Sequence, residues 1–202
     1  MTRTLPTPNL AAVAVMASRI THLYREATPE EVRAGTEWYA TAHALAAELL
    51  PGDTSRAAAI IAVLSPRQAW GRNAALARQA VETGDGASLP VMHDQRRKVM
   101  RLLHGEDPDA VVSGPKVRSF WQTIADPLGT HDAVIDRHAL AVARGERLAG
   151  DALRITPTEY RETVMAYALA ADALGHSPHA VQAVTWLRWR NVHAHPIARA
   201  AG

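Results

Sequence analysis

The sequence predicts an all-α protein, and three observations lead to that prediction. No segment alternates apolar and polar residues for long enough to indicate a strand. Helix-start signals are frequent, the clearest being the capping boxes at Thr28-Pro29-Glu30-Glu31 and Thr156-Pro157-Thr158-Glu159. A third signal is the helical spacing of four apolar residues in the middle of the chain, namely Val117, Phe120, Trp121 and Ile124.

The same signals place the individual helices along the 202 residues. The two capping boxes begin helices 30–50 and 157–174, and Ser65-Pro66-Arg67-Gln68, which has the same form, begins 66–81. Ser177-Pro178 is a weaker start for 178–190, while Gly145 is typical of a helix end. The expected helices are 9–26, 30–50, 55–64, 66–81, 92–104, 107–112, 116–125, 136–144, 157–174 and 178–190.

The stretch 113–138 holds the most chemically suggestive residues. Ser113-Gly114-Pro115 is a turn signal directly before Lys116, and a short apolar run, 133–135, leads to Asp136 at the start of the next helix. The intervening connection spans up to roughly 33 Å when extended, long enough to bring both helix starts to one side. The spacing therefore permits Lys116 and Asp136 to face a common cleft. The alternative is a solvated first-turn lysine and an ordinary helix cap.

Two segments resemble one known family. Gly114-Pro115-Lys116-Val117, followed by Asp136-x-His138, is similar to the signature of the helix-hairpin-helix (HhH-GPD, endonuclease-III-like) DNA glycosylases. Residues 60–70, Ile-Ile-Ala-Val-Leu-Ser-Pro-Arg-Gln-Ala-Trp, resemble the early core helix of that family and the Ser-x-x-Gln turn after it. The match covers roughly 57–144. It implies one unit, 1–202, with two small helical subdomains flanking a cleft: a central one, about 55–135, and a second one made of 1–54 and 136–202.

The resemblance also implies a site. Asp136 and Lys116 would be the catalytic residues of an enzyme that flips a DNA base and cleaves its N-glycosidic bond, with lyase activity through a lysine Schiff base. For Gln68 a helix-capping role competes, and for Trp70 a place in the core. The expected substrate and DNA contacts are Gln68, Trp70, Ser113, Gly114, Arg118, Arg137 and His138.

The sequence departs from the family pattern at the hairpin. Val112-Ser113 replaces the first hairpin glycine, and Pro115 removes a backbone donor. These changes fit a divergent branch, similar to viral amino acid:DNA transferases that add an amino acid or amine to hypermodified thymine. There Lys116, with Arg118 or Arg137, would clamp a diphosphate leaving group. A non-catalytic DNA-binding module is the third hypothesis.

Further basic and aromatic residues have two interpretations each. The basic cluster of residues 96–101 contacts DNA phosphates or forms a solvated helix face paired with Glu106 and Asp107. Trp186 and Trp189 are expected to close a core, with Arg188 and Arg190 outside. Tyr39 and His43 are expected on a packed helix face. The members of the basic cluster are Arg96, Arg97, Lys98 and Arg101.

Composition limits the partners and cofactors. The chain has no cysteine, so an iron–sulfur cluster cannot be ligated. The absence of cysteine also leads us to expect a cytoplasmic protein, which would be in a bacterial host cell if the source is viral. The histidine pairs 176/179 and 193/195 lack a third ligand at useful spacing, so no metal is expected. No apolar run is long enough to cross a bilayer. The net charge of +2 is a mild hint of an anionic partner. The resemblance implies that this partner is DNA, and a monomer is expected.

Overall fold

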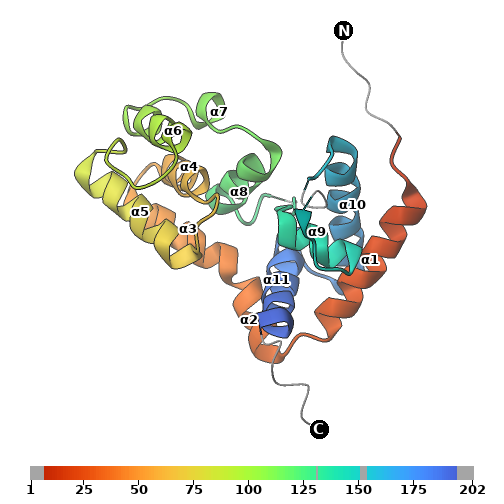
Figure 1. The fold of residues 1–202 in the computed structure, drawn as a ribbon. Coiled ribbons are helices and arrows are strands. Elements are labelled where there is room, and N and C mark those ends of the chain that lie inside the picture. Colours follow the sequence, from red (N-terminus) through yellow and green to blue (C-terminus); the bar gives the residue numbers. More distant parts are fainter. Residues whose placement is uncertain (1–6, 131, 151–153, 195–202) are drawn as a thin grey trace. The chain divides into compact units, whose positions relative to one another are not determined.

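The computed structural model describes residues 7–130, 132–150 and 154–194, and the regular structure of these residues is entirely helical (Figure 1). The all-α prediction is confirmed. None of the described helices is both long and apolar enough to span a membrane. The helices are α1 (Leu10–Arg25), α2 (Pro29–Thr36), α3 (Trp38–Leu49), α4 (Thr54–Leu64), α5 (Trp70–Thr83), α6 (His93–Leu103), α7 (Pro108–Val111), α8 (Pro115–Ala125), α9 (Arg137–Arg144), α10 (Pro157–Leu174) and α11 (Pro178–Ala194).

The chain divides into two compact units. One, which we call the inserted unit, is formed by residues 39–130, and the other, the terminal unit, combines 1–38 with 131–202. The sequence analysis placed the corresponding boundaries at 55 and 135. The difference arises mainly at α3, because its apolar residues from Tyr39 onward belong to the inserted unit.

The inserted unit is built around α4. Every residue of 57–64 is buried, so this helix is apolar on all sides, as expected of a central core helix. Helices α5, α6 and α8 pack against it. Trp121 on α8 donates its indole N–H to the Ser55 carbonyl oxygen (3.0 Å), and His43 Nδ1 donates to the Ile124 carbonyl oxygen (2.8 Å). Tyr39 meets Phe120 edge-to-face, so the predicted packed face of Tyr39 and His43 is confirmed.

The terminal unit packs α1 against α9, α10 and α11, and α2 against α11. Tyr167 is fully buried at its centre and donates its hydroxyl hydrogen to the Ala139 carbonyl oxygen (3.3 Å). Trp189 packs against this core and Arg190 is exposed, as the sequence predicted, whereas the prediction that Arg188 lies outside is wrong, because its side chain is half-buried beside Glu31. Glu31, only 7% exposed, accepts a hydrogen bond from the Asn191 amide (2.8 Å) and lies 3.9 Å from the Arg188 guanidinium.

Helix boundaries follow the local signals at most places. The capping boxes at Thr28 and Thr156 are both formed, and Gly145 adopts the left-handed conformation that ends α9 (φ 70°). The predicted helix 30–50 is wrong as a single element, because the chain breaks at Glu37 between α2 and α3.

The capping box predicted at Ser65 is also wrong. Ser65 ends α4 and donates its hydroxyl hydrogen back to the Ala62 carbonyl oxygen (2.8 Å), so its side chain does not cap a following helix. Arg67 has a left-handed backbone (φ 63°), which prevents a helix from continuing through residues 66–68. Helix α5 begins only at Trp70.

Candidate functional site

Asp136 is fixed as the N-cap of α9, as the helix-cap interpretation predicted. Its Oδ1 accepts hydrogen bonds from the backbone N–H groups of His138 and Ala139, both at 2.8 Å. The preceding residues, 133–135, are buried in the core, so the chain on both sides of the carboxylate is anchored. No other hydrogen bond to this carboxylate comes from residues 7–130, 132–150 or 154–194, which leaves Oδ2 available.

The terminal unit contains a pocket that is lined in part by the two residues after Asp136. Its cavity volume is about 370 Å³, and three chain segments line it: α9, the connection after it, and the end of α11. Arg137 and His138, both predicted site residues, are among the lining side chains. The complete lining is Arg137, His138, Ala141, Arg147, Leu148, Trp189, Arg190 and His193.

The electrostatic setting of His138 favours a neutral imidazole. Burial is the main influence and lowers the pKa of His138; nearby Arg137 and Arg190 lower it further, against an opposing effect of Asp136. The Arg137 Nε–H donates to His138 Nε2 at 3.3 Å, an interaction that requires this nitrogen to be unprotonated. His138 therefore serves as a hydrogen-bond acceptor near neutral pH.

Lys116 lies in the first turn of α8, in the inserted unit, and is not the solvated lysine that the alternative interpretation expected. Its Nζ donates a hydrogen bond to Ser65 Oγ (3.0 Å) and lies 5.1 Å from the centre of the Phe120 ring. The side chain is half-buried. Lys116 thus connects α8 to the turn that contains Gln68, whose own N–H donates to the Ser65 carbonyl oxygen (3.1 Å).

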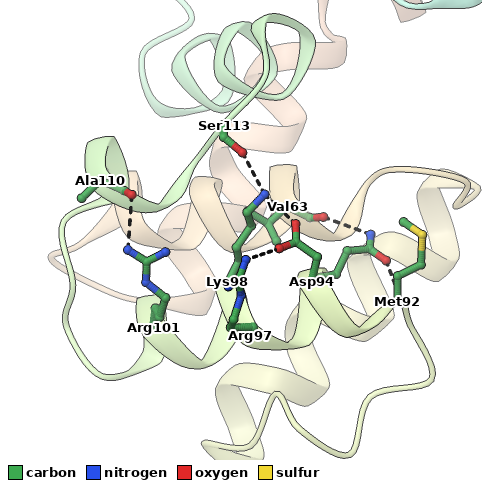
Figure 2. A network of polar contacts seen from close by, with 9 residues as sticks. Val63, Met92, Asp94, Arg97, Lys98, Arg101, Ala110 and Ser113 are labelled. Atoms are coloured by element: carbon green, nitrogen blue, oxygen red, sulfur yellow. Dashed lines mark hydrogen bonds and ion pairs between the residues drawn. The ribbon is translucent and has the colours of Figure 1, made fainter.

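The turn before α8 is held by two basic side chains. Gly114 has a positive φ (82°) and, with Ser113, forms the connection from α7 to α8. Lys98 Nζ donates to Ser113 Oγ at 2.8 Å, as Figure 2 shows. Arg118 donates to the Asp109 and Val112 carbonyl oxygens, both at 3.1 Å, and pairs with the Asp109 carboxylate. The guanidinium of Arg118 is therefore engaged in shaping this turn.

The basic cluster of α6 has internal partners. Asp94, which the sequence analysis did not consider, pairs with Arg97 (2.6 Å) and Lys98 (2.7 Å) (Figure 2). Arg101 pairs with Glu106, as predicted, whereas Asp107 instead caps α7. Arg96 donates its Nε–H to the Val91 carbonyl oxygen (3.1 Å). Contact of this cluster with DNA phosphates stays a prediction.

The predicted site residues thus form two groups. Lys116, Ser113 and the Gln68 turn gather in the inserted unit with Lys98, while Asp136, Arg137 and His138 gather in the terminal unit. Trp70, half-buried, begins α5. The meeting of Lys116 with Asp136 stays a prediction. In the described part of the chain no three histidine, aspartate or glutamate residues could hold a metal, and His195 lies outside it.

Comparison with known families gives a match over residues 6–193 to a family of unknown function, DUF7178. The chain is a DUF7178 protein. Neither the curated proteins nor the solved structures contain a match to it.

One polar residue of this DUF7178 protein that sequence reasoning missed is Gln95. It is 5% exposed, and its Nε2 donates to the carbonyl oxygens of Val63 (3.0 Å) and Leu64 (3.2 Å) at the end of α4. Its Oε1 accepts from the Met92 N–H (3.0 Å) at the start of α6. Gln95 thereby fixes the end of α4, from which the Ser65 turn departs. The sequence signal that could have identified Gln95 is its position at the third residue of a helix, where a glutamine side chain can cap the helix start.

Proposed function

We propose that this DUF7178 protein processes a base in DNA, flipping the base out and cleaving its N-glycosidic bond. The observation that carries the proposal is the Asp136 carboxylate, held by two backbone N–H groups directly before Arg137 and His138, which line a pocket rich in arginine. Such preorganisation matters because a carboxylate that need not reorient stabilises developing positive charge most effectively.

In this proposal Asp136 acts on the sugar. As the bond between C1′ and the base nitrogen breaks, positive charge develops on the sugar ring, and a carboxylate at this place lowers the barrier, as in glycoside hydrolysis. Water then adds to C1′, and its proton is transferred to the departing base. Extrusion of the base from the stack costs a few kcal/mol, which the arginine-rich surroundings offset by contacts to phosphate.

The test is substitution of Asp136 by asparagine. Asparagine caps helices as well as aspartate does, so the fold is retained while the negative charge is lost. We expect base release from modified or damaged duplex DNA to fall by about a hundredfold to a thousandfold. Asp107→Asn is the matched control, because Asp107 also caps a helix, α7. Equal activity of Asp136→Asn and wild type would exclude the proposed role.

A second candidate is a transferase that adds an amino acid or amine to a hypermodified thymine. It is favoured by the three arginines of the pocket that begins after Asp136, since a diphosphate leaving group needs cationic partners. Asp136 would accept the proton of the incoming amine. Mass spectrometry of nucleosides after incubation with DNA carrying diphosphorylated hydroxymethyl-pyrimidine separates the two functions: free base indicates the glycosylase, and a heavier nucleoside indicates the transferase.

A further inference from the structure

The pocket of the terminal unit has an unusual charge. Three of its eight lining residues are arginines, Arg137, Arg147 and Arg190, and all three are exposed. The ion pairs formed among the described residues involve none of these three guanidiniums. By contrast, two other arginines of the terminal unit have acidic partners: Arg144 pairs with Glu159, and Arg188 pairs with Glu31. The lining contains no carboxylate, so positive charge predominates in the pocket.

One wall of the same pocket is aromatic. Trp189 and His193, one turn apart on α11, lie with their ring centres 4.0 Å apart and their planes tilted by 34°. The His193 Nδ1–H donates to the Trp189 carbonyl oxygen (2.8 Å), which fixes the orientation of the imidazole. Arg190 lies over the Trp186 ring, with its guanidinium carbon 4.5 Å from the ring centre. Aromatic surface next to guanidinium groups is the combination that binds a base and a phosphate together.

The size and position of the pocket fit a small ligand. Its volume of about 370 Å³ lies within the range of small-molecule sites, roughly 300–1,000 Å³. Arg137 comes from the first turn of α9, where the N–H groups of His138 and Ala139 are bonded to Asp136, so the contribution of this helix start to the pocket is the Arg137 guanidinium. Arg147 comes from the connection after α9 and Arg190 from α11, so three chain segments each contribute an arginine to the same pocket.

We propose that this pocket binds a nucleotide, with Arg137, Arg147 and Arg190 around its phosphate and Trp189 with His193 against its base. The phosphate belongs either to a free nucleotide or to a nucleotide of a DNA strand, and both present the same chemistry. This binding site goes beyond the proposed reaction, because it does not require Asp136 to act on the ligand.

The experiment is calorimetric titration of the full chain with thymidine 5′-monophosphate, inorganic phosphate and a short single-stranded oligothymidylate. Arg147→Gln and Arg190→Gln are the test variants, since both side chains are exposed and their loss leaves the core intact. Each is expected to weaken nucleotide binding about tenfold, the usual effect of removing one charged hydrogen-bond donor. Arg25→Gln, an exposed arginine at the end of α1, is the control and should bind like wild type.

The arms of the experiment separate the two sources of phosphate. Binding of the monophosphate indicates a free nucleotide, and binding of the oligonucleotide without the monophosphate indicates a strand. Either result supports the proposal if binding is weaker in both pocket variants and unchanged in Arg25→Gln. No saturable binding of any probe, or equal affinity of the pocket variants and wild type, overturns it. Inorganic phosphate binding as tightly as the nucleotide overturns the role of the aromatic wall. Nucleotide binding is measured here without base release, so failure of the proposed reaction is distinguished from failure of this site.

Discussion

At the scale of single residues, Lys116 has the most specific predicted role. Its hydrogen bond to Ser65 Oγ and its position over Phe120 hold the amine in place at the start of α8. If the protein acts as a lyase, the neutral amine attacks the C1′ aldehyde of an abasic site and loses water to form a Schiff base.

Borohydride trapping tests this role. Reduction of the Schiff base gives a stable covalent adduct between protein and abasic DNA. We expect Lys116→Ala to abolish the adduct, because the substitution removes the amine that is proposed to attack the sugar. Lys98→Ala, which removes a lysine bonded to the neighbouring turn residue Ser113, should leave the adduct in place. An undiminished adduct in Lys116→Ala would remove this residue from the mechanism.

Glu31 is predicted to make the stability of the protein dependent on pH. Burial opposes its ionisation, but hydrogen bonds from Thr28 and Asn191, together with the charge of Arg188, outweigh burial and hold the pKa of Glu31 below its usual range. A carboxyl with a depressed folded-state pKa stabilises the fold above its unfolded pKa of about 4.3. This stabilisation is lost as the pH falls through the folded-state value.

Urea unfolding of Glu31→Gln measures that contribution. At about pH 7 the variant should be less stable than wild type by about 1–3 kcal/mol, and the difference should shrink toward about pH 3 as wild-type Glu31 is protonated. Glu30→Gln is the neighbouring control, because Glu30 is exposed and its loss should change stability by about 0.5 kcal/mol or less. A difference for Glu31→Gln that persists unchanged at low pH would contradict the explanation.

At the scale of helices, Gly35 sets how closely α2 approaches α11. A Cβ added there would lie 2.6 Å from the Val184 Cα and equally close to its backbone nitrogen, so the two helices would have to separate. We expect Gly35→Ala to destabilise the protein by about 1–3 kcal/mol, the usual cost of overpacking. Gly71→Ala is the matched control: Gly71 is exposed in α5 with nothing within 4 Å of an added Cβ, and alanine should stabilise that helix slightly. Thermal unfolding followed by circular dichroism compares the two, and equal melting temperatures would refute the packing argument.

The helices also show which features local sequence can predict. The capping boxes at Thr28 and Thr156 form because each side chain bonds an N–H only three residues away. Ser65 has the same local pattern, yet its hydroxyl donates to Ala62 behind it and accepts from Lys116, which is 51 residues away. A contact over that separation leaves no periodic signal, so the predicted helix start was wrong there.

The same limit applies to the site at the scale of the whole molecule. Asp136 as the start of a helix was predictable from the apolar run before it and from Gly145, which is typical of a helix end. The pocket was not, because Arg147, Trp189 and Arg190 become neighbours of Arg137 only through the packing of α9 against α11. Its discovery required the tertiary structure of the terminal unit.

Lyase activity would use residues of both units, since Lys116 lies in one and Asp136 in the other. The chain has no cysteine, so a double variant, Lys116→Cys with Asp136→Cys, carries the only two thiols. If both residues face one substrate cleft, a short bis-maleimide should link them within one chain, and digestion followed by mass spectrometry should show the joined peptides. The two single-cysteine variants are the controls and should yield no intramolecular product. Absence of the joined peptides in the double variant, with or without DNA, would contradict a shared active site, because flexible thiols that share a cleft come within reach of such a reagent.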